Sequence, residues 1–334
     1  MSTKVKWGVL GVADIATKKV IPAMQKGGMS EVAAIASRDR TRAAKAAKEL
    51  GIPKEFGSYE ELLADPEIEA IYNPLPNHLH VPWTIKAAEA GKHVLCEKPI
   101  ALTVKEATSL IEVRDRTGVK IQEAFMVRTH PQWLGALGQI RSGKIGKVKS
   151  VSCYFSYCNL DPNNIRNIAD VGGGALMDIG CYLVLSSRVI FDEEPSRVVG
   201  LIERDPDFQT DILTSAILDF PSGHAVWTCG TQVAPYQRVL AFGNKGRLEI
   251  EIPFNAPPDV PCRIFVDDSS NGRNPQTIEF ETADQYTIQG DVFSKAIREN
   301  SSQAVPLEWT IKNMAVIEAI FRSAQSGQWE KPSA

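Results

Sequence analysis

The first 124 residues alternate short apolar runs with helix-like stretches, and this alternation limits the fold more than any other feature of the chain. Apolar runs predict five strands, at 4–10, 31–36, 70–73, 93–96 and 120–124. A predicted helix at 40–50 ends before Gly51, and Ser58 with Glu61 has the spacing of a capping box. Strands that alternate with helices predict a doubly wound parallel sheet with helices on both of its faces.

The pattern changes near residue 125, where long β-type runs replace the alternation. These runs lie at 148–157, 195–202, 211–219, 224–231, 238–243, 247–252, 263–266 and 276–281, with turn signals at 221–223, 243–246 and 271–272. Helices are predicted at 132–142, 174–191, 286–300 and 307–327. We therefore expect an α/β chain. Its first domain, 1–125, binds a dinucleotide, and its second, 126–334, is an α+β domain with a large, mostly antiparallel sheet for substrate binding and oligomerisation.

Charge and targeting signals exclude several classes of function. The 334 residues carry a formal net charge of -3, which gives no reason to expect nucleic acid or an anionic membrane as a partner. The first residues have no apolar signal-peptide core, so we expect a cytoplasmic protein. The histidines and six cysteines lack the spacing of a metal site, and we expect no metal.

The first predicted strand runs into a turn of small residues, Gly11-Val-Ala13-Asp14-Ile15-Ala16. A dinucleotide fold needs small residues here so that backbone can approach a pyrophosphate at a helix N-terminus. Alanine stands at two of the three usual glycine positions, and an ordinary tight turn is the alternative. The place of this turn after the first strand favours dinucleotide binding.

The end of the second strand bears on which dinucleotide binds. NAD enzymes usually place an acid there to hold the ribose hydroxyls, whereas this chain has Ser37 and Arg38, with Arg42 one turn later. Two arginines attract a 2′-phosphate through charge-assisted hydrogen bonds, which predicts NADP. The alternative is that the arginines only solvate a helix start.

Two further segments follow strand ends, where open α/β sheets hold ligands. Pro74-Leu75-Pro76-Asn77-His78-Leu79-His80 follows the third strand, and Asn77 could bind a ribose or cap a helix. Cys96-Glu97-Lys98-Pro99 follows the fourth. A lysine can lower the pKa of a nearby hydroxyl or stabilise an alkoxide. Without the other motifs, the preferred interpretation of Lys98 is a surface lysine that follows a strand.

Asp178 and Tyr182 lie in a helix that begins in three glycines, at 172–174. A spacing of four residues puts both side chains on one helix face, where they could orient and deprotonate a substrate hydroxyl. A phenol is a poor base at its usual pKa of about 10, so Tyr182 needs a cation, and Lys98 is the candidate. The alternative is a core tyrosine in a closely packed helix.

Together these segments resemble the glucose–fructose oxidoreductase / inositol dehydrogenase (Gfo/Idh/MocA) family. The resemblance rests on GVADIA at 11–16, ASRD at 36–39, PLPNHLH at 74–80, CEKP at 96–99, EAFMVRTHPQ at 123–132 and GGGALMDIGCY at 172–182. It implies a Rossmann domain, an open-faced C-terminal sheet and a substrate held between the nicotinamide and that sheet. Many members have histidine where this chain has Tyr182. The tyrosine is similar to the branch that holds glucose–fructose oxidoreductase, NADP-dependent xylose dehydrogenase and dihydrodiol dehydrogenase.

The resemblance implies that Lys98, Tyr182 and Asp178 are catalytic. The residues expected to bind the cofactor are Gly11, Ala13, Asp14, Ile15, Ser37, Arg38, Arg42, Pro74, Leu75, Asn77, His80, Glu97 and Lys98. Those expected to touch a sugar are Arg128, His130, Asn164 and Arg166.

The function expected is transfer of a hydride between NADP and a CH–OH or C=O carbon of a sugar. Candidate reactions are oxidation of an aldose such as xylose or glucose to its lactone and reduction of a ketosugar. The alternatives are a trans-dihydrodiol dehydrogenase, a non-catalytic NADP-binding sensor, and an enzyme that keeps its cofactor and shuttles hydride between two sugars. A large open sheet should not stay exposed, so we expect a homodimer or homotetramer.

Overall fold

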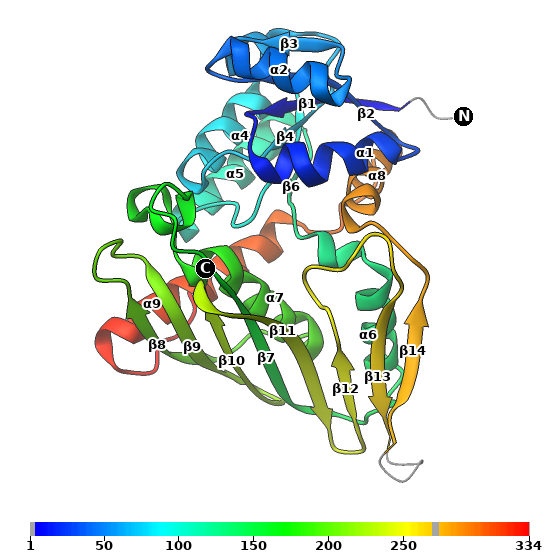
Figure 1. The fold of residues 1–334 in the computed structure, drawn as a ribbon. Coiled ribbons are helices and arrows are strands. Elements are labelled where there is room, and N and C mark those ends of the chain that lie inside the picture. Colours follow the sequence, from blue (N-terminus) through cyan, green and yellow to red (C-terminus); the bar gives the residue numbers. More distant parts are fainter. Residues whose placement is uncertain (1–3, 269–273, 334) are drawn as a thin grey trace. The chain divides into compact units, whose positions relative to one another are not determined.

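The computed structural model describes residues 4–268 and 274–333. The described chain divides into two compact units (Figure 1). Unit 1 comprises 1–129 and 284–310, and unit 2 comprises 130–283 and 311–334. We expected domains of 1–125 and 126–334, and the differences are that 126–129 and 284–310 belong to the first unit. The turn expected at 271–272 lies outside the described residues.

Unit 1 is built on a parallel sheet that has six strands among the described residues, in the order β3-β2-β1-β4-β5-β6. Its strands are β1 (Val5–Leu10), β2 (Ser30–Ala36), β3 (Lys54–Phe56), β4 (Ala70–Asn73), β5 (His93–Cys96) and β6 (Ile121–Glu123). The pairings between these described strands are parallel. The chain reverses its direction of winding at β1, so the carboxyl ends of β1 and β4 flank the point where such sheets bind ligands. The doubly wound prediction is confirmed, and β3 is a strand that we did not predict.

Several helices of unit 1 begin at side chains that cap their first N–H groups. The helices of this unit are α1 (Ile21–Lys26, after a π-turn at Ala16–Val20), α2 (Arg40–Leu50), α3 (Tyr59–Ala64), α4 (His80–Glu89), α5 (Val104–Thr117) and α8 (Gln285–Arg298). Asp39 caps α2 by accepting the Thr41 N–H at 2.9 Å. Ser58 caps α3 by accepting the Glu61 N–H at 3.1 Å, as the capping-box pattern predicted.

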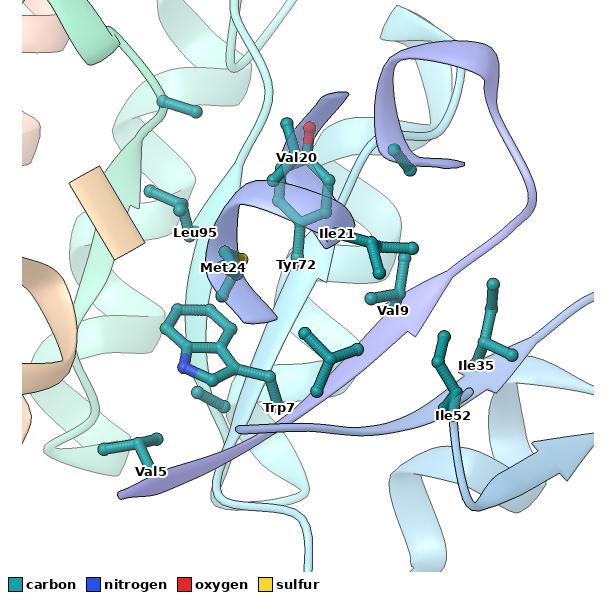
Figure 2. Packing of buried hydrophobic residues seen from close by; sticks show 14 of the residues in the cluster. Val5, Trp7, Val9, Val20, Ile21, Met24, Ile35, Ile52, Tyr72 and Leu95 are labelled. Atoms are coloured by element: carbon teal, nitrogen blue, oxygen red, sulfur yellow. The ribbon is translucent and has the colours of Figure 1, made fainter. Parts of the chain in front are cut away.

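The core of unit 1 explains why α8 belongs to it. Figure 2 shows Trp7 on β1 packed with Met24, Tyr72 and Leu95. The Trp7 ring also lies 5.8 Å from the ring of Phe293 on α8, and its Nε1 donates to Ser294 Oγ at 3.0 Å. These contacts join residues more than 280 positions apart, so no local pattern could reveal them.

Unit 2 is built on a sheet that has eight strands among the described residues, in the order β14-β13-β12-β11-β7-β10-β9-β8 (Figure 1). Its strands are β7 (Val148–Cys158), β8 (Arg197–Arg204), β9 (Asp211–Phe220), β10 (Gly223–Gly230), β11 (Gln232–Gly243), β12 (Arg247–Ile250), β13 (Cys262–Asp267) and β14 (Gln276–Phe280). The β7–β10 pair is parallel and the other pairs of described strands are antiparallel, which confirms a mostly antiparallel sheet.

One face of this sheet packs against helices α6 (Pro131–Arg141) and α7 (Cys181–Phe191), and α9 (Leu307–Ser326) continues from unit 1 into unit 2. The helical segment Ala169–Phe191 is long and apolar enough to cross a membrane, but its apolar window is wholly buried in the fold. Its side chains therefore serve as core. The opposite face of the sheet is more exposed and carries Leu201, Ile217, Val226 and Phe242.

Candidate functional site

The turn after β1 requires the glycine that the sequence places there. Gly11 has φ +86°, a left-handed conformation that other residues rarely adopt. An added Cβ would lie 3.1 Å from the Leu75 side chain and 3.6 Å from the Tyr59 hydroxyl. Backbone at Gly11 thus lies close to the loop after β4, and its positive φ favours glycine at this position. Such a turn lets a pyrophosphate approach the main chain.

The residues that follow Gly11 have different surroundings. Asp14 is exposed and pairs with Lys18 at 2.7 Å, four residues along the chain. Ala13 and Ile15 are partly buried against the hydrophobic core of unit 1. The turn therefore presents backbone and one carboxylate, while Ile15 anchors it to the core.

Two arginines gather beside a tyrosine at the end of β2. Ser37 is buried, and its hydroxyl accepts the Asp39 N–H at 3.2 Å. Tyr59, the first residue of α3, is hydrogen-bonded to Arg38 and lies within the field of Arg42. Burial raises the pKa of the Tyr59 phenol, and the two guanidinium groups oppose that rise. The cluster is a cationic site beside Gly11 without an acid at position 37.

Tyr59 is a candidate binding residue that our reading of the sequence missed. Its hydroxyl faces Gly11 and its ring packs edge-to-face on Trp83, with centroids 4.7 Å apart. It comes three residues after β3, and β3 pairs with β2 so that Phe56 O accepts the Ser37 N–H. Recognition of β3 as a strand would have placed Tyr59 at the same sheet edge as Ser37.

The loop after β4 is fixed by buried polar groups. Asn73 Nδ2 donates to His80 O at 3.1 Å and to Thr84 Oγ1 at 3.3 Å, and Asn73 Oδ1 accepts the Leu75 N–H at 3.3 Å. These bonds shape the turn that holds Pro74 and Leu75. Asn77 begins the short 3₁₀ turn Asn77–Leu79.

His80 connects two of the predicted binding turns. It is 1% exposed, with Nδ1 2.7 Å from Pro99 O and Nε2 2.6 Å from Leu75 O. Burial lowers its pKa to about 4, although two carbonyl acceptors favour the protonated ring. The ring is thus placed to position the Leu75 and Lys98-Pro99 turns.

The turn after β5 carries Glu97 and Lys98. The Glu97 carboxylate accepts the Tyr72 hydroxyl at 2.7 Å and the Lys98 N–H at 3.3 Å. Burial and the charge of Glu97 raise the pKa of Tyr72 well above its usual value, and both raise the pKa of Tyr286 as well. Two neutral phenols therefore face Glu97, and Glu97 fixes the backbone that carries Lys98. The Lys98–Pro99 peptide bond is cis.

In unit 2, a glycine-rich entry allows the helix that carries Asp178 to start against β9. Gly174 has φ +117°, and an added Cβ would overlap the Asp211 carboxylate. Asp211 Oδ2 accepts the Leu176 N–H at 2.6 Å and the Thr214 hydroxyl at 3.1 Å. Burial raises the pKa of Asp211, and these two donors oppose the rise. A single π-turn, Leu176–Gly180, then leads into α7.

Asp178 and Tyr182 have different surroundings. Tyr182 is 4% exposed, with its ring centroid 6.1 Å from that of Phe155 and 5.4 Å from that of Phe254. Asp178 is 9% exposed, and its Oδ2 accepts the Tyr157 hydroxyl at 2.7 Å and Arg166 Nε at 2.9 Å. Tyr157 was missed by sequence reading, because its contact with Asp178 joins β7 to a helix 21 residues later.

The four residues expected to touch a sugar are divided between the units. Arg128 lies in unit 1, with its guanidinium 5.4 Å from the Trp309 ring, although we expected it in the second domain. His130 is buried and caps α6 by accepting the Gln132 N–H at 3.3 Å. Asn164 caps a 3₁₀ turn by accepting the Arg166 N–H at 3.1 Å. The structure thus joins Arg166 directly to Asp178.

Metal ligands do not gather in the described part of the chain. Within 4–268 and 274–333, no three side chains of histidine, cysteine, aspartate or glutamate are grouped so that they could hold an ion. The six cysteines are free thiols; five are buried and Cys158 is exposed.

Comparisons with known proteins agree with this architecture. Residues 5–125 match the oxidoreductase family with an NAD-binding Rossmann fold, and residues 136–249 match the GFO/IDH/MocA C-terminal domain. The chain is 50% identical to an uncharacterized oxidoreductase from Rhizobium meliloti, with 98% of each chain covered. It is 38% identical to D-xylose 1-dehydrogenase (NADP(+)) 2 from Haloferax volcanii, over 96% of this chain and 98% of that one.

A solved structure shares the whole fold. A 3-ketoreductase from Actinomadura kijaniata, in complex with NADP and TDP-benzene, superposes with a TM-score of 0.90 at 28% identity. That match covers 96% of this chain and 98% of the other. With matches to both domain models and to relatives along its length, this chain belongs to the GFO/IDH/MocA family of NAD(P)-binding oxidoreductases.

Proposed function

We propose that the protein is an NADP-dependent dehydrogenase or reductase that acts on a CH–OH or C=O carbon of a sugar. The substrate class we favour is an aldose such as xylose or glucose, oxidised to its lactone; the reverse reduction of a ketosugar uses the same groups. The observation that carries the proposal is the Arg38–Arg42–Tyr59 cluster beside Gly11, together with an Asp178 carboxylate that is buried and hydrogen-bonded. The xylose dehydrogenase relative supports the choice of substrate.

The residues of unit 1 fit a dinucleotide that bears a 2′-phosphate. Glycine at position 11 keeps a side chain out of the turn, and position 37 carries no acid that would repel the phosphate. The residues assigned to the pyrophosphate and the adenosine half are Gly11, Ala13, Asp14, Ile15, Ser37, Arg38 and Arg42. Those assigned to the nicotinamide half are Pro74, Leu75, Asn77, His80, Glu97 and Lys98. When bound, NADP supplies the acceptor for two electrons and a proton equivalent.

The chemistry that the chain itself supplies is proton transfer and orientation. In the oxidative direction, Tyr182 Oη takes the proton of the substrate hydroxyl as a general base. A cation favours the phenolate form of tyrosine, and we assign that task to Lys98. Asp178 accepts a hydrogen bond from the substrate and orients the reacting carbon. The same residues return the proton in the reductive direction.

A substrate panel tests the proposal. Absorbance of the reduced nicotinamide is followed with NADP and NAD against aldoses, polyols, ketosugars and aromatic dihydrodiols. Turnover of an aldose or ketosugar with NADP preferred supports it. Turnover of dihydrodiols alone would replace the substrate class, as the dihydrodiol dehydrogenase relative from Mus musculus suggests. NADP binding without turnover of any compound would favour a sensor or a permanently bound cofactor.

The cofactor preference gives a quantitative prediction. In Arg38→Ala/Arg42→Ala, we expect KM for NADP to rise about 100-fold, because two charge-assisted hydrogen bonds to the 2′-phosphate are lost. KM for NAD should change less than threefold. Lys48→Ala, which removes a charge from the last turn of α2, is the matched control. Equal losses with both cofactors would contradict the assignment of these arginines.

We also propose that the chain forms a homodimer or homotetramer through the exposed face of the unit 2 sheet. Strand register places Ile217 opposite Val226, and Leu201 opposite Ser215, so their side chains share this face. Leu201 is 77%, Val226 47% and Ile217 39% exposed, a run of apolar side chains that soluble monomers seldom leave uncovered.

Light scattering after size-exclusion chromatography tests this surface. The wild type should have two or four times the mass of one chain, and Ile217→Lys/Val226→Glu should shift it to one. Leu134→Glu, a single apolar-to-charged change at an exposed residue of α6, should leave the mass unchanged. A monomeric wild type would refute the proposed interface.

A further inference from the structure

Two hydrogen-bond donors from distant parts of unit 2 converge on one oxygen of Asp178. Tyr157 lies near the end of β7, and Arg166 lies in the 3₁₀ turn Ile165–Asn167. The Tyr157 hydroxyl is 2.7 Å and Arg166 Nε 2.9 Å from Asp178 Oδ2. The Asp178 side chain is 12% exposed, so these donors bind a carboxylate that is largely removed from water.

The loop that carries Arg166 is held in place by bonds of its own. The carbonyl of Arg166 accepts the Gly174 N–H at 2.9 Å, and the Ile168 carbonyl accepts the Gly173 N–H at 3.1 Å. At Gly173, an added Cβ would lie 2.6 Å from the Arg166 carbonyl, so only glycine lets the loop lie this close. Asn167 Nδ2 donates to Asp161 O at 2.9 Å and ties the start of the loop to its middle. The guanidinium of Arg166 is therefore presented from a fixed backbone.

We propose that Tyr157 and Arg166 are positioning residues that keep the Asp178 carboxylate ionised and in one orientation for the substrate. This inference rests on the proposed role of Asp178 in the oxidoreductase reaction. Burial alone would favour the protonated acid, and a protonated Asp178 could no longer accept the substrate's hydrogen bond. A cation and a hydroxyl donor on the same oxygen both favour the ionised form.

The surroundings indicate that Tyr157 acts as a donor. Burial and the charge of Asp178 raise the pKa of Tyr157 well above its usual value, and Arg166 only partly opposes this. Titratable side chains that interact with Asp178 include Tyr157 on β7, Arg166 in the 3₁₀ turn, and Cys229 on β10, whose pKa burial raises well above its usual value. Tyr157 and Cys229 thus stay neutral, and Arg166 supplies a positive charge beside the carboxylate.

The pH profile of kcat/KM tests this role. We expect Tyr157→Phe to lower kcat/KM about tenfold at pH 7 and to move the acidic limb of the profile up by about one pH unit. Arg166→Gln should move the limb further, and Arg166→Lys should restore part of the loss because it keeps the charge. The controls are Tyr154→Phe, a tyrosine of the same strand that packs on Tyr236, and Arg197→Gln, an arginine paired with Asp219.

A second measurement does not depend on turnover. In protein labelled with ¹³C at the aspartate carboxyls, the Asp178 resonance is identified by its loss in Asp178→Asn, and its chemical shift is followed against pH. A titration midpoint about one unit higher in Tyr157→Phe, and higher still in Arg166→Gln, supports the proposal. Unchanged midpoints and an unshifted limb would overturn it. If no sugar is turned over while the midpoints still shift, the proposed function fails and the positioning of Asp178 stands.

Discussion

Replacement of Tyr182 by phenylalanine should lower kcat by about 10²–10⁴-fold while KM for NADP stays within about threefold of wild type. A positioned general base contributes a factor of that size, and the substitution removes only the phenolic oxygen. The ring of Tyr182 packs on Phe155 and Phe254 and is 4% exposed, so the aromatic contacts are preserved in the variant. Steady-state kinetics with saturating NADP measure the effect.

The fold of the variant can be checked separately from its activity. Thermal unfolding of Tyr182→Phe should resemble that of the wild type, because the phenyl ring still fills the same space. Tyr236→Phe, at a residue that is 51% exposed on β11, should keep full activity. Near-normal turnover by Tyr182→Phe would mean that another group accepts the proton.

Replacement of Lys98 by methionine should lower kcat by about 10²–10³-fold, which is the usual cost of losing one group that stabilises a developing negative charge. Methionine retains the length of the side chain and removes only the ammonium group. The effect should weaken as pH rises, since a more basic solution favours the phenolate that Lys98 is proposed to stabilise. Rates measured between pH 6 and pH 10 would show this dependence.

Lys105→Met on α5 is the matched control, because Lys105 is exposed near the start of that helix. Its rate should be that of the wild type at every pH. An equal loss of rate in both variants, or a loss in Lys98→Met that does not depend on pH, would contradict a role for the Lys98 charge in proton transfer.

Local sequence patterns predicted the fold class and most elements, in part because two helices of unit 1, α2 and α5, end at a residue with a clear conformational role. Gly51 and Gly118 both adopt the left-handed conformation at helix ends. β3 escaped prediction because Lys54–Phe56 is a strand of three residues with two charged side chains. Because β3 was not predicted, Tyr59 was not recognised as a candidate binding residue either. The structure places Tyr59 beside Gly11 and Arg38.

Contacts between distant residues account for the rest of what the sequence did not reveal. Phe293 and Ser294 on α8 pack against Trp7, and this contact places α8 in unit 1. The sequence of neither segment indicates that it contacts the other. In the candidate site, motifs identified Asp178 and Lys98 as positions of interest. The groups that hold these segments, Tyr157 for Asp178 and Tyr72 for Glu97, are 21 and 25 residues away along the chain.

Transfer of isotope from the sugar to the cofactor tests the central claim most directly. The protein is mixed with NADP and D-xylose or D-glucose deuterated at C1, and the mass of the reduced cofactor is measured by mass spectrometry. We expect the reduced NADP to carry one deuterium, which makes it heavier than NADP reduced by unlabelled sugar. Less product should form when NAD replaces NADP. If neither sugar reduces the cofactor, or if the reduced cofactor carries no deuterium, direct transfer from the C1 carbon of an aldose is contradicted.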